Sequence, residues 1–112
     1  MTLGEKQRLF THYIGSLILW AYDNGFELTF GDAFRSPEQA AINAAQGKGI
    51  KNSLHCERLA VDFNLFKDGQ YMTGTESYKP LGEFWESLHP LARWGGRFGD
   101  GNHFSFEHNG RK

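Results

Sequence analysis

The strongest constraint on the fold is the pattern of residues 59–66, in which every second side chain is a large apolar one. Successive side chains of a β-strand point to opposite faces, so this period of two gathers an apolar set on one face: Leu59, Val61, Phe63 and Leu65. The opposite face carries Asp62 between Ala60 and Asn64. A sheet with one apolar face must bury it against a second layer. We therefore predict a strand that builds the core on one side and presents a carboxylate on the other.

Local signals predict the remaining elements. Apolar residues at three- and four-residue spacing indicate the first helix, and Ser36 followed by Pro37 is typical of a helix start. Gly31 is expected to form a bulge in the first strand, and Gly47-Lys48-Gly49 to end the second helix. The predicted elements are helices over residues 2–24, 36–45 and 81–88, strands over residues 26–34 and 103–108, and a hairpin turn at Asp68-Gly69 leading to Tyr71.

The last predicted strand repeats the division into two faces. Phe104 and Phe106 share one face, whereas His103 lies on the other with Ser105. If the two strands belong to one sheet, Asp62 and His103 can share its polar face. We therefore predict an α+β fold, in which helices cover one face of a small antiparallel sheet and a polar cleft with Asp62 and His103 occupies the other.

A third polar residue, His55, precedes the strand and completes a set of two imidazoles and one carboxylate with Asp62 and His103. Three such ligands suit a catalytic zinc, which keeps a fourth position open, whereas structural zinc sites are usually closed by four ligands that often include thiolates. The chain has one cysteine, so a Cys-rich structural site is excluded. The competing interpretation is a surface histidine beside a solvated carboxylate. Asp100 stands three residues before His103 and could act as a general base.

The order of these residues resembles a known family. Ser-x-His-x6-Asp, here Ser53, His55 and Asp62, followed by Asp-x-x-His, here Asp100 and His103, is similar to the zinc D-alanyl-D-alanine peptidases. That family includes D,D-carboxypeptidases, D,D-dipeptidases and phage endolysins that cut the L-alanyl-D-glutamate bond of peptidoglycan. Two further blocks resemble the family in the same order: Phe34-Arg35-Ser36 followed by Gln39, where the family has Tyr-Arg-Ser, and Arg93-Trp94-Gly95-Gly96-Arg97-Phe98.

The resemblance implies a role for each matching residue. It assigns one Zn²⁺ per chain to His55, Asp62 and His103, and catalytic roles to Asp100 and Arg35. A guanidinium suits a substrate carboxylate or an oxyanion better than lysine does, although a surface salt bridge is the alternative for Arg35. Ser53 and Gln39 match positions near the substrate and could equally be caps or surface groups. Two positions depart from the family: Arg58 replaces a frequent Gly, and Ser105 replaces a frequent Glu.

Composition and hydropathy limit the binding partners and the cellular location that we expect for this chain. The formal net charge of −1 comes without a basic cluster, which argues against nucleic acid as a partner. The N-terminal segment lacks a secretory signal, and no apolar run reaches membrane-spanning length, so we expect no membrane insertion. At 112 residues we expect a single catalytic domain over residues 1–112 without a wall-binding module, and a monomer. It would be made in the host cytoplasm and reach periplasmic peptidoglycan through a separate pore former.

The expected function is zinc-dependent cleavage of the L-alanyl-D-glutamate bond in the peptidoglycan stem peptide, as in an endolysin of a phage or prophage. Three alternatives stay open at this point. The first is a D-alanyl-D-alanine carboxypeptidase of the same family. The second is a zinc-stabilised binding module without turnover. The third is a thiol enzyme built on Cys56, although a lone cysteine is more often buried and inert.

Overall fold

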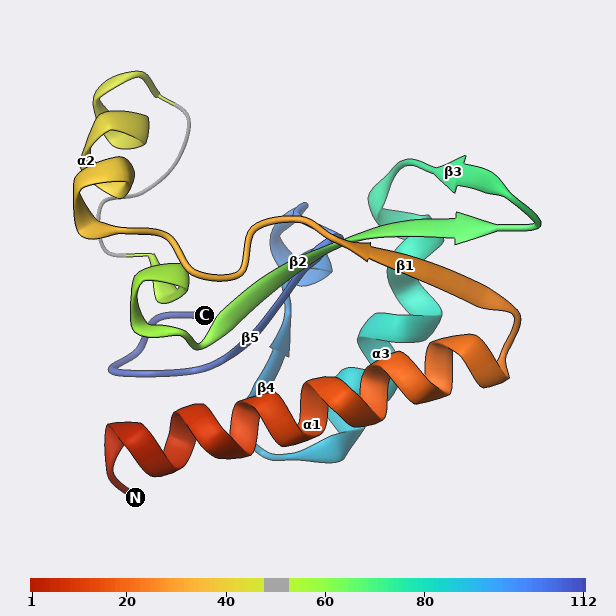
Figure 1. Cartoon of the computed structure of the whole chain (residues 1–112), viewed down its shortest axis with the longest axis horizontal. Coiled ribbons are helices and arrows are strands. Elements are labelled where there is room, and N and C mark those ends of the chain that lie inside the picture. The colour runs from red at the N-terminus through yellow and green to blue at the C-terminus, as the bar shows by residue number, and fades with distance from the viewer. Residues whose placement is uncertain (48–52) are drawn as a thin grey trace.

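The computed structural model describes residues 1–47 and 53–112 (Figure 1). The helices are α1 (Leu3–Asp23), α2 (Pro37–Ala45) and α3 (Lys79–Leu88). The strands are β1 (Phe26–Phe30), β2 (Ala60–Lys67), β3 (Gln70–Met72), β4 (Ala92–Trp94) and β5 (His103–Phe106). Short 3-10 helices form η1 (Leu54–Glu57), η2 (Thr75–Tyr78) and η3 (Gly95–Phe98).

The strands form a single five-stranded antiparallel sheet in which β2 is the longest member. The order is β1-β2-β5-β4, and β3 also pairs with β2. β1 occupies one edge of β2, while β3 and β5 share the other edge at separate positions along it. The register of β2 with β5 sets Asp62 opposite His103. The predicted sharing of one sheet face by these two residues is therefore confirmed.

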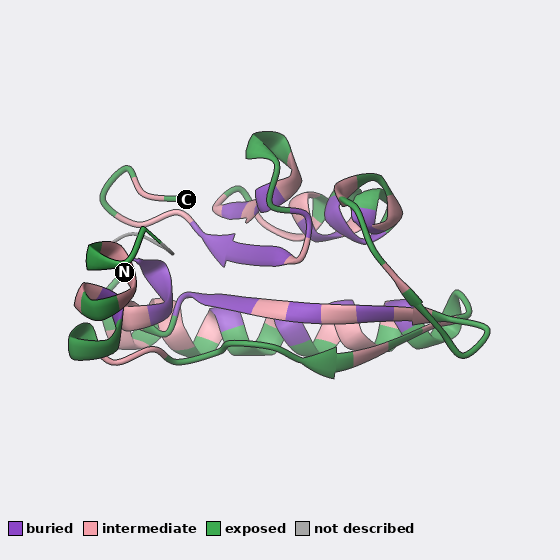
Figure 2. Cartoon of the chain, turned by 90° about the horizontal axis from the view of Figure 1, so that it is seen from above, coloured by how far each residue is buried: buried purple, intermediate pink, exposed green. Residues whose placement is uncertain are grey.

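The core lies between the sheet and the helices α1 and α3. α1 runs beneath the strands in Figure 1, and its Thr2–Glu5 capping box fixes its first turn. Burial alternates along β2, whereas β1 is mostly exposed at the edge (Figure 2). Large apolar side chains from the sheet and both helices form one cluster; its members with almost no exposed surface include Leu17, Phe63, Leu65, Leu81, Trp85, Phe104 and Phe106. The predicted α+β class, with a small antiparallel sheet, is confirmed.

The predicted elements with strong local signals are all present. The three helices, the strand at residues 59–66 and the hairpin at Asp68-Gly69 agree with the structure to within about two residues. Both turn residues of the hairpin have positive φ, 53° and 76°, as its tight turn requires. Gly47, after α2, also has positive φ; Lys48 and Gly49, in the predicted stop signal, lie outside the described residues.

Two strand boundaries were predicted too far along the chain. β1 ends at Phe30 and not at residue 34, because Gly31 and Asp32 both face Asp62: the Gly31 N–H donates to the Asp62 carbonyl (2.8 Å) and the Asp62 N–H donates to the Asp32 carbonyl (2.7 Å). This is the expected bulge, and it diverts the chain from the ladder. β5 ends at Phe106, and His108 instead pairs with Arg111. β4 was not predicted.

Within the described parts of the chain, none of the helices combines the length and apolarity needed to cross a membrane.

Candidate metal centre

Three side chains converge from three separate elements. His55 lies in η1, Asp62 in the middle of β2, and His103 at the start of β5. Ser53 caps η1: its buried hydroxyl accepts a hydrogen bond from the His55 N–H (3.2 Å). Arg58 ends η1 in the left-handed region, with φ 55°, and so turns the chain from η1 into β2. This turn lets His55 reach Asp62 although the two are seven residues apart in sequence.

Asp62 Oδ1 stands between the two imidazoles. It lies 3.3 Å from His55 Nε2 and 3.3 Å from His103 Nδ1. One ligand atom from each residue can be chosen so that all lie within 4.8 Å of one another. Both histidines are buried, and Asp62 is half-buried. The described residues therefore contain a compact His–Asp–His group whose donor atoms face a common point.

The outer nitrogen of each imidazole is held by a backbone carbonyl. His55 Nδ1 lies 3.0 Å from the Ala33 oxygen, and His103 Nε2 lies 3.3 Å from the Lys112 oxygen. A carbonyl only accepts, so each outer nitrogen must carry the proton when the imidazole is neutral. His55 Nε2 and His103 Nδ1 are then left with free lone pairs that point toward Asp62. Metal-binding histidines are oriented in this way, by hydrogen bonds from the ring nitrogen that does not bind the ion.

Electrostatics keep the carboxylate ionised. Burial opposes the charge on Asp62, but hydrogen bonds with His103 and His55 outweigh it and lower the pKa of Asp62 from 3.8 to about 2. Burial also opposes the protonated form of His55, yet the neighbouring Asp62 carboxylate prevails and raises the His55 pKa. The group thus attracts positive charge, either protons on the imidazoles or a cation between them.

The donor set fits zinc. Two neutral imidazole nitrogens and one carboxylate oxygen are ligands that Zn²⁺ takes in catalytic sites, where three protein ligands leave a further position for water or substrate. A calcium or magnesium site would instead be built from oxygen ligands. The chemistry of these residues therefore favours a transition metal that prefers nitrogen, with zinc the first candidate.

Arg35 lies next to this group. Its N–H donates to the His55 carbonyl (3.2 Å), and its side chain is only 15% exposed. The guanidinium pairs with Asp32 at 2.7 Å, so the salt bridge considered from sequence exists. The positive charge of Arg35 also acts on His55, where it favours a lower pKa against the larger influence of Asp62. Arg35 is therefore a largely buried cation at the edge of the metal group, and its contact with substrate remains a prediction.

The other predicted site residues have different surroundings. Asp100 is exposed in the turn before β5 and lies outside the metal group. Its backbone is fixed at both ends, by the Gly95 carbonyl (2.8 Å) and by the His103 N–H (3.1 Å). Gln39 is exposed on α2, and its amide donates to Asn43 (2.7 Å). Cys56 is half-buried, with its sulfur 4.0 Å from the Ser36 carbonyl oxygen.

Comparison with solved structures finds a similar fold in a zinc enzyme. The structure is that of a mutant of the vancomycin resistance D,D-pentapeptidase VanY, from a VanB-type resistance cassette, in complex with Zn(II). The TM-score is 0.57 at 20% sequence identity, and the match covers 87% of this chain and 70% of that chain. No protein-family model and no curated protein matches the sequence. The chain therefore has the fold of a zinc D,D-peptidase and carries a His–Asp–His group able to hold a metal.

Proposed function

We propose that this chain is a zinc-dependent peptidase that hydrolyses a peptide bond in bacterial peptidoglycan. The observation that carries the proposal is the His55–Asp62–His103 group, with both outer imidazole nitrogens held by carbonyls. With its outer nitrogen held, each imidazole turns its inner nitrogen toward the same carboxylate, as metal-binding histidines do. The similarity of the fold to VanY supports the assignment.

The resemblance to the family assigns a proposed role to each matching residue. His55 Nε2, Asp62 and His103 Nδ1 would hold one Zn²⁺, which supplies Lewis acidity toward a carbonyl and toward water. Asp100 would take a proton from the attacking water and pass it to the leaving amine. Arg35 would bind a substrate carboxylate or the developing oxyanion with its planar donors. Ser53 acts on the chain itself, by fixing the turn that carries His55.

For the substrate bond we favour the L-alanyl-D-glutamate bond of the stem peptide. The support is the order of the sequence blocks, which resembles the family that includes these endolysins, and the cationic Arg35 beside the metal group. Residues 1–112 would act as one catalytic domain and as a monomer. The enzyme would be made in the host cytoplasm and would reach the periplasmic wall after a separate protein opens the membrane.

The likeness to VanY favours a second candidate, a carboxypeptidase that removes terminal D-alanine. The two candidates release different products from the same substrate. Cleavage between L-alanine and D-glutamate exposes a new amino group on D-glutamate, whereas the carboxypeptidase releases free D-alanine and leaves the rest of the stem intact.

Mass spectrometry of purified peptidoglycan after digestion by the zinc-loaded protein separates these outcomes. We expect fragments that begin with D-glutamate. Free D-alanine without such fragments would select the carboxypeptidase. A wall that yields neither product, under conditions in which a known lytic peptidase works, would contradict the proposed function.

A further inference from the structure

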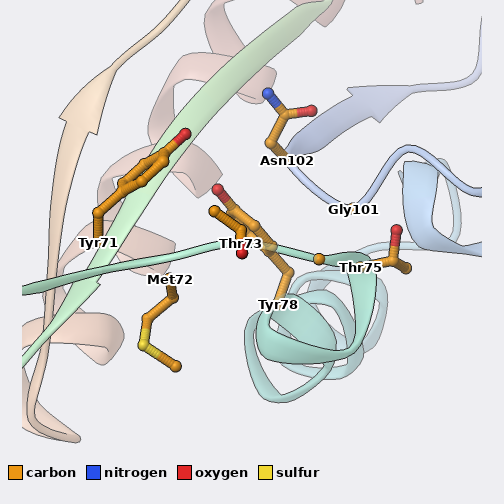
Figure 3. A pocket seen from close by; sticks show the side chains of 8 residues that line it. Tyr71, Met72, Thr73, Thr75, Tyr78, Gly101 and Asn102 are labelled. Carbon is orange, nitrogen blue, oxygen red and sulfur yellow. The ribbon is translucent and has the colours of Figure 1, made fainter.

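A second feature lies beside the metal group, at a break in strand pairing along one edge of β2. β3 pairs with residues 65–67, and β5 pairs with residues 60–62. Between them the Phe63 N–H donates to the Asn102 carbonyl (3.0 Å), and the Phe63 carbonyl accepts from the Tyr78 hydroxyl (3.0 Å). A pocket of about 220 Å³ opens at this break (Figure 3).

The walls of the pocket are polar but carry no charged side chain. Hydroxyl groups come from Tyr71, Thr73, Thr75 and Tyr78, and an amide comes from Asn102 (Figure 3). The walls are also held firmly. Tyr78 is buried, and its hydroxyl is hydrogen-bonded. The Gly101 backbone lies so close to Thr75 that a Cβ on Gly101 would be 2.7 Å from the Thr75 Cα. The pocket is smaller than the roughly 300–1,000 Å³ sites that enclose drug-sized ligands, so it suits a single ring or side chain.

The pocket shares a loop with two of the proposed site residues. Gly101 and Asn102, which line it, are the two residues between Asp100 and His103. Burial is the main cause of the raised pKa of Tyr78 in this pocket; Tyr71 adds to it, and the Asp62 carboxylate has the smallest influence. A substrate lying across the metal group can therefore extend into this pocket.

The chemistry of the walls selects among the parts of peptidoglycan. Its stem peptides carry carboxylates, and a pocket without a cation cannot compensate a carboxylate taken out of water. Its sugars carry hydroxyl and N-acetyl groups, which match the hydroxyls and the Asn102 amide as hydrogen-bond partners. Tyr71, 57% exposed at the rim, offers a flat apolar face on which a sugar ring can pack.

We propose that this pocket binds a neutral N-acetylated sugar of the glycan strand while the attached stem peptide lies across the metal group. The proposal rests on the proposed function and adds a direction to it: the glycan side of the substrate lies toward Asn102, and the carboxylate side lies toward Arg35. It makes the enzyme selective for stem peptide that is still joined to glycan.

The kinetic test compares two substrates that share the same stem peptide, one joined to its disaccharide and one released from it. Wild type should show the higher kcat/KM on the glycan-linked form. Tyr71→Ala should lower this preference by roughly fivefold or more, the value of an aromatic contact, and Thr73→Val should lower it with little change of shape. Tyr22→Ala, at a similarly exposed tyrosine on α1, is the matched control and should keep the preference. Equal kcat/KM on both substrates in wild type, or a preference that survives both pocket variants, would overturn the proposal.

A binding test separates failure of the pocket from failure of the proposed function. Zinc-loaded ¹⁵N-labelled protein is titrated with N,N′-diacetylchitobiose, a neutral disaccharide that contains no peptide. We expect saturable amide shifts at Tyr71, Thr75 and Asn102 in wild type and their loss in Tyr71→Ala. Such shifts would support the pocket even if neither peptide substrate were hydrolysed. Their absence in wild type at millimolar disaccharide would overturn the sugar assignment, whatever the hydrolysis assay shows.

Discussion

At the scale of single residues, the central position belongs to Asp62. One of its carboxylate oxygens lies 3.3 Å from a nitrogen of each histidine, and its pKa is lowered to about 2. A charge so placed is stabilised by protons on His55 and His103 or by a cation. Of the two other residues with proposed catalytic roles, Asp100 is accessible to water and Arg35 is a largely buried cation.

We predict that His103→Ala loses zinc. Loss of a hydrogen bond that supports a ligand typically weakens zinc binding by about 10- to 100-fold. Removal of the ligand itself should weaken zinc binding more. Metal analysis of the protein after gel filtration measures the effect. His12→Ala, which removes an exposed histidine from α1, is the control and should keep its zinc. Full zinc occupancy in His103→Ala would remove His103 from the metal group.

We predict that Asp100→Asn keeps zinc and thermal stability but loses hydrolysis. Its side chain is exposed before β5, and loss of a general base typically lowers kcat by about 10²- to 10⁴-fold. Turnover of peptidoglycan fragments, zinc content and the melting temperature are measured together. Asp23→Asn, at an exposed carboxylate near the end of α1, should behave as wild type. Near-normal turnover in Asp100→Asn would show that another group takes the proton.

We predict that Arg35→Lys lowers turnover much more than it lowers stability. Lysine keeps the charge but lacks the planar pair of donors that a carboxylate or oxyanion would use. The comparison is with Arg97→Lys, where an exposed ion pair with Glu86 should contribute little to stability. If both variants turn over equally well, Arg35 serves only its salt bridge with Asp32, and its proposed contact with substrate is wrong.

Sequence patterns could identify the three metal-group residues but not the atoms that orient them. His55, Asp62 and His103 are chemically distinctive, and their spacing resembles a family pattern. The groups that hold their outer nitrogens are the carbonyls of Ala33 and Lys112. Every residue has a carbonyl, so only the folded chain reveals which ones are used. Ser53 did carry a signal, because serine is a favoured cap.

At the scale of elements, the loop from η3 to β5 positions the site through close backbone contacts. A Cβ on Gly95 would overlap the Asp100 carbonyl oxygen and would lie 2.7 Å from His103 Cβ. Only glycine allows this approach, which places the predicted base and a metal-group histidine on one tight turn. Trp94, just before it, donates from its indole to the Gly101 carbonyl (2.7 Å) and braces the same turn.

We therefore predict that Gly95→Ala damages the site and the fold together. Forcing the loop apart should cost about 1–3 kcal/mol in the free energy of unfolding and should weaken zinc binding. Gly15→Ala is the matched control, because a Cβ there meets no atom within 4 Å and alanine favours the helix; it should stabilise by about 0.5–1 kcal/mol. Denaturant unfolding and zinc titration of both variants give the answer. A Gly95→Ala protein with wild-type stability and zinc affinity would contradict the role given to this loop.

The elements that could be predicted are those whose signals are local. α1 has an apolar stripe and a capping box, α2 has Ser36 and Pro37 at its start, and the β2–β3 hairpin has Asp68-Gly69. β4 is a short strand whose pairing partner, β5, follows after η3. Its existence depends on that tertiary pairing, so the local pattern did not reveal it. The early end of β1 likewise depends on the backbone hydrogen bonds of Gly31 and Asp32 with Asp62.

At the scale of the whole molecule, the apolar residues that form the core are distinct from the polar residues that form the metal group. α1, α3 and the apolar side chains of β2 and β5 form one core. The same two strands supply Asp62 and His103 to the metal group, and η1 supplies His55. The α+β class followed from the predicted helices together with the alternation in residues 59–66, because a one-sided strand requires a covering layer. The same register that buries Phe63 and Phe104 sets Asp62 beside His103. One strand pairing therefore contributes both to the core and to two of the three residues of the metal group.

The most direct test of this account is hydrolysis of purified peptidoglycan by the chelated protein before and after stoichiometric zinc is restored. We predict that chelation abolishes release of new amino groups, that one equivalent of Zn²⁺ per chain restores it, and that Asp62→Asn is not restored by the same addition. Hydrolysis that persists in the metal-free protein, or full restoration of Asp62→Asn by zinc, would contradict the claim that the His55–Asp62–His103 group holds the catalytic metal.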